Sequence, residues 1–463
     1  MLEKNALENV LNAALESEAD FAEVYVEHTW QQSMSLQDQK VENIGTNELS
    51  GAGIRIAKGY QSVYGHTNHI DEESLLALAK DLRVAFAGER FMGPVTLKPA
   101  ETKNDHVIRI SPETVDVAEK VNLMKRADKS ARLYSKDIKQ VNVRYMDTVQ
   151  NVQIASTEDI HIKDKRVRTR LAISSVAQNE HDMQSGFNGP GAHQGFEFYD
   201  TFDVEEAARE SARIAVTMLY ADECPSKTMP VVVDNGFGGV IFHEACGHSL
   251  EATSVAKNAS VFSGKKGEKI GSELVTAVDD GTIPNAWGSS NFDDEGRPQK
   301  KRVLIKDGVL TSFMVDHLNG RRMNEASTHS GRRQSYKFAP TSRMSNTYIE
   351  NGTSTFDEII ENTEYGLYAR KMGGGSVNPS TGEFNFAVME GYMIRNGKIA
   401  EPVKSASLVG TGKDALKKID MVGNNLERAQ GMCGSASGSI PTDVGQPTIR
   451  IASITVGGRK GDA

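Results

Sequence analysis

Cysteine is scarce in this sequence. Its 463 residues include three cysteines, Cys224, Cys246 and Cys433, which are far apart along the chain. Three scattered thiols cannot form the dense disulfide framework that stabilises small secreted proteins. The sequence therefore predicts a protein of a reducing compartment, the cytoplasm.

Long hydrophobic runs and clusters of basic residues are also missing. No window approaches the ~18 continuous apolar residues of a membrane-spanning helix. Residues 1–20 have the pattern of an acidic amphipathic helix, without the charged and apolar regions of a signal peptide. The formal net charge is −9, and no polybasic run occurs. These absences argue against a membrane protein and against nucleic acid as the main partner.

Apolar residues make up 38% of the chain, and its 42 glycines outnumber its 13 prolines. This composition is typical of a folded, turn-rich protein, and the chain is longer than one hydrophobic core usually organises. The polar, proline-containing segment 221–230 separates two halves of different pattern. We predict an α+β fold of two domains. Residues 1–225 would form an N-terminal α+β domain, and residues 226–463 a strand-rich, mostly antiparallel C-terminal domain.

Hydrophobic periodicity predicts the elements of the N-terminal half. Its predicted helices cover residues 2–17, 71–88, 112–135 and 203–220. Its predicted strands cover residues 21–28, 32–44, 51–67, 140–157 and 161–178. In the second half, the dipeptides Asp307-Gly308 and Asn396-Gly397 favour the two-residue turns of β-hairpins.

One short apolar stretch, "GGVIFHEACGHSLEAT" at residues 238–253, contains the residue types of a zinc peptidase site. His243 and His248 are the candidate metal ligands, and Glu244 directly follows the first. Zinc peptidases commonly have the spacing H-E-x-x-H, whereas here one more residue intervenes. In a regular α-helix, residues five apart point about 140° apart around the axis. A wider π-type turn brings them to one face, so the motif predicts a distorted helix, in which Gly247 would supply backbone freedom.

A catalytic zinc ion needs three protein ligands and one open position. The candidates for the third ligand are Glu251, Cys246 and Cys433. Glu251 could share a helix face with His248, and Cys246 should point away from both histidines. Cys433 lies in a glycine- and serine-rich segment that we expect to be a flexible loop. Spacing alone does not choose among the three, and the competing interpretation is a pair of buried structural histidines without a metal.

Three groups of motifs extend the pattern over essentially the whole chain. They are "HEACGH" (243–248), "YGLYARKMGGGSVNPSTGEFNF" (365–386) with "EGYMIRNGKIAEPVK" (390–404), and "GMCG" (431–434) with "VGQPTIRI" (444–451). Together these motifs are specific, and the chain resembles the TldD/PmbA family of metalloproteases, whose members were once named as candidate modulators of DNA gyrase.

The resemblance implies that His243, His248 and Cys433 hold the metal. Members of the PmbA-like branch, also called TldE, typically lack these ligands and act as partner subunits. This sequence keeps all three residues and therefore resembles the catalytic TldD branch. The segment after Cys433, "GSASGSIP", departs from the more basic or glutamine-bearing stretch expected there, so its contacts with substrate do not follow from the resemblance.

The resemblance implies proteolysis, and the residues agree with it. Zn²⁺ would polarise the scissile carbonyl group, while Glu244 would accept a proton from the attacking water and pass it to the leaving amine. A thiolate ligand should make zinc a weaker Lewis acid, which predicts modest turnover. The alternative function is that of a non-catalytic peptide-binding or regulatory subunit with a structural metal. Such a subunit has no need of Glu244.

A strand-rich domain can take up an extended peptide as an added strand, which predicts unfolded or short peptides as substrates. The segment "KMGGGSVNP" (371–379) either allows close approach of a peptide backbone or is a mobile loop. The two arginines of "GRRQSY" (331–336) either bind a peptide carboxylate or lie in a solvated turn.

The resemblance implies a dimer, either of identical subunits or with a PmbA/TldE-like subunit. No nucleic acid or membrane partner is expected.

Overall fold

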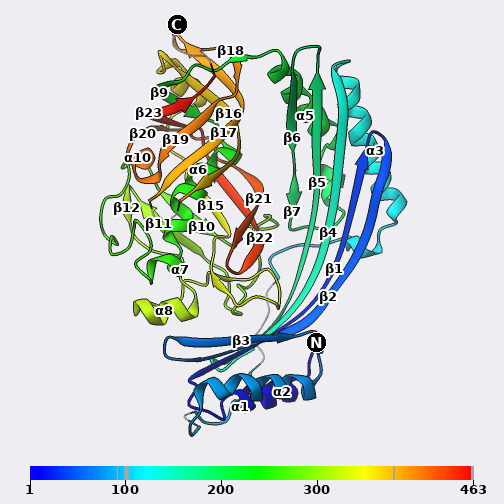
Figure 1. Ribbon diagram of the computed structural model, residues 1–463, viewed down its shortest axis with the longest axis vertical. Helices are drawn as coiled ribbons and strands as arrows, with labels where there is room; N and C mark the ends of the chain where they lie inside the picture. Colours follow the sequence, from blue (N-terminus) through cyan, green and yellow to red (C-terminus); the bar gives the residue numbers. More distant parts are fainter. Residues whose placement is uncertain (91, 99–103, 379–380, 460–463) are drawn as a thin grey trace.

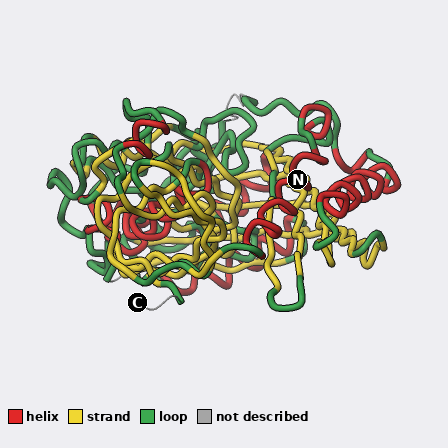
Figure 2. The backbone as a smooth tube through the Cα atoms, turned by 90° about the horizontal axis from the view of Figure 1, so that it is seen from above, coloured by secondary structure: helices red, strands yellow, loops and turns green. Residues whose placement is uncertain are grey.

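The computed structural model describes residues 1–90, 92–98, 104–378 and 381–459. It has two parts (Figure 1). A long, curved antiparallel sheet with its helices is built from the first half of the chain, and the second half forms a strand-rich body. Figure 2 shows the molecule at right angles, with long helices at the end opposite the strand-rich body.

In the described residues, the N-terminal sheet has seven antiparallel strands in the order β3-β2-β1-β4-β5-β6, with β7 also paired to β5. The strands are β1 (Phe21–Gln37), β2 (Lys40–Lys58), β3 (Gln61–Thr67), β4 (Ile138–Ser156), β5 (Ile160–Gln178), β6 (Met183–Asn188) and β7 (Gly191–Ala192). The predicted division into 21–28, 32–44 and 51–67 is wrong in its boundaries. Asp38 and Gln39, with φ of 50° and 68°, turn the chain inside one predicted strand. This turn contains no glycine or Asn-Gly pair that would mark it in the sequence.

Helices cover one face of this sheet. They are α1 (Lys4–Ala14), α2 (Glu72–Arg83), α3 (Val117–Tyr134), α4 (Phe198–Thr201) and α5 (Val204–Leu219). Alternate residues of a strand point to opposite faces. Val24 and Val26 of β1 belong to the core under α1 and α2, while Met34 and Leu36, further along the same face, belong to the core under α3 and α5. The odd-numbered residues of β1 lie on the opposite face of the sheet, which faces the second half of the chain.

Buried charged groups join that second face to the strand-rich body. Glu23 of β1 accepts hydrogen bonds from Arg55, at 2.8 Å, and from Arg333. Arg166 of β5 donates to Asp294 at 2.5 Å. All five side chains are buried, and removing one partner of such a pair leaves an uncompensated charge. These contacts fix the curved sheet against the body.

Over the part of the chain that the structure describes, the strand-rich body contains two larger sheets and one two-stranded sheet. The first has the order β12-β11-β10-β15-β22-β21. Its strands are β10 (Ala277–Asp280), β11 (Lys301–Lys306), β12 (Val309–Leu310), β15 (Asn346–Ile349), β21 (Glu427–Ser435) and β22 (Gly438–Gln446). The strands of the second are β8 (Asp222–Glu223), β9 (Lys227–Val233), β16 (Tyr365–Val377), β17 (Glu383–Arg395), β18 (Lys398–Lys404), β19 (Ser407–Thr411), β20 (Ile419–Val422) and β23 (Ile449–Gly457). Within it, β16, β9, β23, β19 and β17 pair in a closed circuit. The two-stranded sheet pairs β13 (Gly331–Arg332) with β14 (Thr341–Ser342).

Short helices connect these strands, namely α6 (Val240–Phe242), α7 (Ala252–Val255), α8 (His317–Met323), α9 (Phe356–Glu361) and α10 (Gly412–Lys417). The two predicted hairpins are confirmed. Asp307-Gly308 joins β11 to β12, Asn396-Gly397 joins β17 to β18, and all four residues have φ between 48° and 78°. The predicted α+β class, with a strand-rich second half, is also confirmed. Within the described ranges, no helix is long and apolar enough to cross a membrane.

Candidate metal centre

The helix that carries the two histidines begins directly after a central strand. β9 lies between β16 and β23 and ends at Val233. The chain then forms a 3₁₀ turn over Gly236–Gly239, the helical turn α6, and a π-helical turn over His243–Gly247. The three apolar side chains of α6 are buried in the core of the strand-rich body. This anchoring fixes the position of the histidines.

The π-helical turn confirms the distorted helix that the H-E-x-x-x-H spacing predicts. It brings the imidazole rings of His243 and His248 together, with centroids 5.2 Å apart and planes at 84°. The role predicted for Gly247 is wrong. Its φ of −54° and ψ of −52° are ordinary helical values. A Cβ atom at this position would lie 2.3 Å from Sδ of Met344, so the glycine is needed for space and not for backbone freedom.

Cys433 lies in β21, and the expectation of a flexible loop is wrong. β21 pairs with β22 along its whole length, with Cys433 opposite Ile440. On its outer edge, β21 has no strand partner within the described part of the chain. Small polar residues are tolerated on such an open edge, which explains a loop-like composition in a strand.

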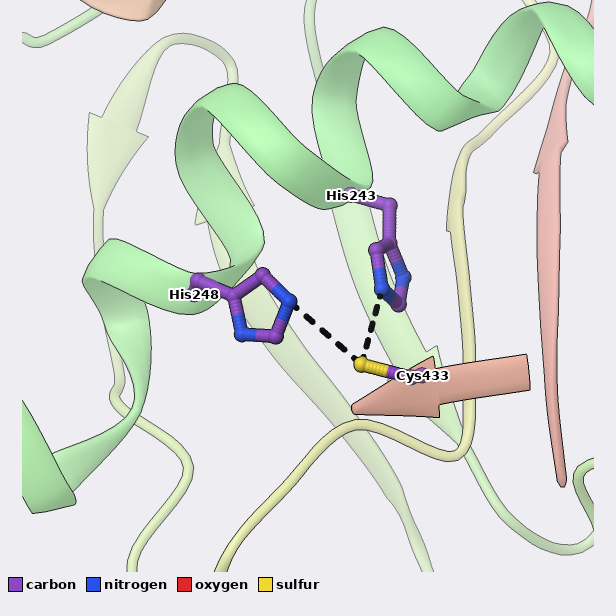
Figure 3. Close-up of side chains that lie close together, drawn as sticks. All are labelled: His243, His248 and Cys433. Carbon is purple, nitrogen blue, oxygen red and sulfur yellow. Dashed lines mark hydrogen bonds between the residues drawn. The ribbon is translucent and has the colours of Figure 1, made fainter. Parts of the chain in front are cut away.

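Three side chains converge from these elements (Figure 3). The Nε2 atoms of His243 and His248 lie 3.3 Å and 3.4 Å from Sγ of Cys433. All three donor atoms lie within 4.8 Å of one another, and such a group could hold a metal ion. In a tetrahedral zinc site, bonds of about 2.0 Å to nitrogen and about 2.3 Å to sulfur separate these ligand atoms by about 3.5 Å. The observed nitrogen–sulfur spacing fits that geometry.

The charges around the three donors favour a cation. Burial raises the pKa of the Cys433 thiol, but the imidazoles of His243 and His248 outweigh burial and lower this pKa to about 4. Burial lowers the pKa of His248, but the carboxylate of Glu251 and the Cys433 sulfur outweigh burial and raise this pKa to about 11. The thiolate is the form of cysteine that binds metals. The protein therefore stabilises the ligand form of Cys433.

Glu251 and Arg343 support the three donors from behind. Oε2 of Glu251 lies 3.2 Å from Nδ1 of His248, the ring nitrogen that does not face Cys433. Arg343 is buried and donates to the carbonyl oxygen of Cys433, while its Nε lies 3.8 Å from Oε1 of Glu251. A partner on the second ring nitrogen fixes the tautomer and orientation of a metal-binding histidine. Glu251, a predicted candidate for the third ligand, thus lies behind His248 instead.

Glu244 lies on the accessible side of the group. Its Oε2 is 3.7 Å from Nε2 of His248, the nitrogen that also faces Cys433. The side chain of Glu244 is 29% exposed, whereas that of Glu251 is 5% exposed. Water and substrate can therefore reach Glu244, as a general base requires.

The other residues that the sequence suggested as ligands or substrate contacts lie in the core or in the contact between the two halves. Cys246, a candidate for the third ligand, is buried in the apolar core, and burial raises its pKa. Both predictions for the arginines at 331–336 are wrong. Arg332 and Arg333 are buried, and Arg333 pairs with Glu23 of the N-terminal sheet. Arg343 was not predicted, because nothing in its local sequence links it to a residue 90 positions away.

A cleft of about 570 Å³ runs along β21 as far as Met432, the residue before Cys433. Its lining includes residues 427–432 of β21, residues 370–374 of β16 and residues 234–238, which precede the histidine helix. The segment 371–377 belongs to β16, which pairs with β17, so the interpretation as a mobile loop is wrong there. Pro379 lies outside the described residues. A Cβ atom at Gly374 would meet no atom of the described residues within 4 Å, which leaves room for another backbone.

Two imidazoles and a thiolate around one point, next to an accessible glutamate, are typical of metal-dependent hydrolases. Family models agree with this class. Three models of the PmbA/TldA metallopeptidases match the chain, namely domain 1 over residues 22–85, the central domain over residues 110–219 and the C-terminal domain over residues 226–458. The chain belongs to this family of metallopeptidases.

Two relatives named metalloprotease TldD homolog show the similarity along the chain. The protein of Haemophilus influenzae is 34% identical over 470 residues, which cover 99% of this chain and 97% of the relative. The protein of Buchnera aphidicola from Acyrthosiphon pisum is 33% identical over 453 residues, which cover 95% and 93%. The chain is therefore a metallopeptidase.

Solved structures show the same fold. A Thermotoga maritima protein, described as a candidate modulator of DNA gyrase, superposes with a TM-score of 0.80 at 21% identity and covers 98% of this chain and 99% of its own. TldE from Thermococcus kodakarensis superposes with a TM-score of 0.76 at 17% identity, covering 97% and 99%.

Proposed function

We propose that this metallopeptidase is a zinc enzyme that cleaves unfolded or short peptides. His243, His248 and Cys433 would be the zinc ligands, and Glu244 the general base. The convergence of three donor atoms beside an accessible glutamate carries this proposal. Three protein ligands leave the fourth tetrahedral position free, as a catalytic zinc site requires.

The chemistry is divided between the ion and the protein. Zinc, when bound, would supply Lewis acidity toward the peptide carbonyl group. Glu244 accepts the proton of the attacking water and passes it to the leaving nitrogen. Glu251 and Arg343 hold His248 and Cys433 in their orientations from behind. A thiolate ligand donates more charge than a third imidazole would, so we expect modest turnover.

The open edge of β21 supports an extended substrate. An extended peptide can pair with an edge strand through main-chain hydrogen bonds, which depend little on its side chains. The adjoining cleft of about 570 Å³ is of the size that binding sites commonly have. A folded protein cannot present a free strand to this edge, so unfolded segments and short peptides are the expected substrates.

The substitution Glu244→Gln tests the assignment of the base. The zinc-loaded wild type should cleave an unfolded peptide, and the variant should lose about 100-fold or more in kcat because an amide cannot accept the proton. Elemental analysis should still find one zinc ion per chain in the variant. The matched control Glu268→Gln, on an exposed segment of the same body, should keep full activity. Full activity of Glu244→Gln would rule out its role as the base.

The second candidate function is that of a non-catalytic peptide-binding or regulatory subunit. It predicts that the zinc-loaded wild type binds an unfolded peptide and does not cleave it over long incubation. The position of Glu244 on the accessible side of the donor group favours the catalytic role, since a binding subunit does not use a base.

We also propose the assembly and setting of the protein. A dimer, of identical chains or with a TldE-like subunit, would limit access to the cleft to unstructured chains. Native mass measurement with and without such a subunit distinguishes the two forms.

Three free, buried cysteines favour the cytoplasm as the compartment. The division into domains 1–225 and 226–463 predicts that mild proteolysis cuts within 221–230 before it cuts elsewhere.

A further inference from the structure

We propose that Arg144 and Arg170 form a subsite for a carboxylate of the peptide substrate, on the Met432 side of the candidate metal centre. This inference rests on the proposed peptidase function and deepens it by naming a substrate class. Peptides with an acidic side chain or a free C-terminal carboxylate near the cleaved bond would be preferred.

The subsite lies in a second hollow, of about 690 Å³, which is lined by strands of the N-terminal sheet and by Met432 of β21. This hollow shares Arg170, Phe187 and Met432 with the cleft that runs along β21. Met432 is 49% exposed and immediately precedes Cys433. The hollow therefore adjoins the proposed path of the peptide and lies across β21 from the buried side chain of Cys433, because successive residues of a strand point to opposite faces.

Strand alternation explains why two serines of β1 line the hollow. Odd-numbered residues of β1 point away from the helices. At one end of the strand, Glu23 and Tyr25 are buried against the second half of the chain. At the other end, Ser33 and Ser35 on the same face line the hollow. The odd-numbered face of β1 is thus buried against the second half of the chain at one end and lines the hollow at the other end.

The charged side chains that line the hollow are all positive. Arg144 and Arg170 are its charged residues, and no acidic residue occurs among the described residues that line the hollow. In the register of β4 and β5, Arg144 lies opposite Ala172 and Arg170 lies opposite Met146, so the arginines are diagonal neighbours on one face. Diagonal neighbours stand roughly 7 Å apart, which allows two long side chains to contact one carboxylate. This positive wall occurs in a chain with a net charge of −9.

Neither arginine is neutralised by a carboxylate within ion-pair distance in the described ranges. Arg144 is exposed on the sheet. Arg170 donates to the carbonyl oxygens of Gly189, at 3.1 Å, and of Gln430 in β21, at 3.3 Å. These neutral acceptors hold the Arg170 side chain beside the edge strand, where its guanidinium also lies over the Trp287 ring, 5.5 Å from the centroid. Arg170 also feels the charge of Asp443, which lies beyond ion-pair distance.

The cleft along β21 has a different character. Its acidic residues Glu210 and Glu390 are both bound by Arg213, at 2.7 Å and 2.8 Å. Glu427 and Lys371 also line it, so charges of both signs face the same space. A mixed wall does not select one sign of substrate charge. Selection for a carboxylate is therefore expected at the hollow and not along the cleft.

Three peptides test the subsite and separate the two sources of a carboxylate. They differ only in one residue near the cleaved bond and in the chemical group at the C-terminus. The first has a glutamate near the cleaved bond and a C-terminal amide. The second has glutamine there and a free C-terminal carboxylate, and the third has glutamine and an amide. With the zinc-loaded wild type, at least one carboxylate peptide should exceed the neutral peptide about tenfold in kcat/KM, a difference of about 1.4 kcal/mol. This preference should weaken at high salt.

In Arg144→Gln, the ratio between carboxylate and neutral peptides should fall to about one. The control Lys163→Gln removes the same charge from an exposed position on the opposite face of β5 and should keep the wild-type ratio. Equal kcat/KM for all three peptides in the wild type, or an unchanged ratio in Arg144→Gln, would overturn the subsite while leaving the peptidase function in place. Failure of the wild type to cleave any of the three would overturn both.

Discussion

Glu251 and Cys433 contact opposite nitrogens of the same imidazole ring. Oε2 of Glu251 lies 3.2 Å from Nδ1 of His248, and Sγ of Cys433 lies 3.4 Å from Nε2. A ring held at both nitrogens has one orientation and one direction in which it can present a lone pair. The orientation of His248 is therefore set by contacts within the protein.

Removing the charge of Glu251 should weaken metal binding. In Glu251→Gln the amide can still hydrogen-bond to His248, but the negative charge that strengthens this imidazole as a ligand is lost. Zinc affinity should fall about 10- to 100-fold, as is typical for outer partners of metal-binding histidines. Competition with a chromophoric chelator measures this affinity. Glu268→Gln is the control for loss of one acidic group, and equal affinities in the two variants would contradict the role assigned to Glu251.

A methyl group at position 247 should strain the π-helical turn. In Gly247→Ala the new Cβ meets Sδ of Met344, which is buried and cannot move freely. Overpacking of this kind costs about 1–3 kcal/mol in the free energy of unfolding. Denaturant titration of Gly247→Ala, Met344→Ala and the double variant measures the coupling. The double variant should be more stable than the sum of the single effects predicts, and additive effects would refute the steric explanation.

The buried pair between Glu23 and Arg333 should hold the two halves of the molecule together. Arg333→Met leaves part of the charge of Glu23 uncompensated in a buried site, which should cost about 3 kcal/mol and lower the thermal midpoint. Arg395→Met removes an exposed pair with Glu401 and should change stability by about 0.5 kcal/mol or less. Similar midpoints for the two variants would show that the interface does not depend on this pair.

Stability should decline with pH because of Asp443. Burial raises the pKa of its carboxyl group to about 7, above the ordinary value of 3.8. Between these two values the folded chain keeps a proton that the unfolded chain releases, so stability falls as the pH rises from about 4 to about 7, by up to a few kcal/mol. Asp443→Asn removes this group from titration. The thermal midpoint of Asp443→Asn relative to that of the wild type should rise between pH 5 and pH 8. For the exposed control Asp357→Asn, the difference in thermal midpoint from the wild type should not change with pH. Parallel curves for Asp443→Asn and wild type would contradict the pKa shift.

Local patterns in the sequence predicted the features that depend on a few neighbouring residues. The spacing of His243 and His248 requires a turn wider than that of an α-helix, and a π-helical turn is present. The Asp-Gly and Asn-Gly pairs mark turns because both of their residues tolerate positive φ. Asp71 and the apolar period after it predicted a helix, and Asp71 accepts a hydrogen bond from the backbone of Ser74 at its start.

Only the tertiary structure decided which distant residues meet. Cys433 lies 190 positions from His243 and reaches it because β21 ends a sheet whose inner strands are fixed by pairing. Arg343 and the arginines of the curved sheet likewise acquire their roles from strand order and register. A sequence expresses local geometry through the spacing of its own residues. Contacts across a sheet depend on which strands become neighbours, and the global packing of apolar faces determines this.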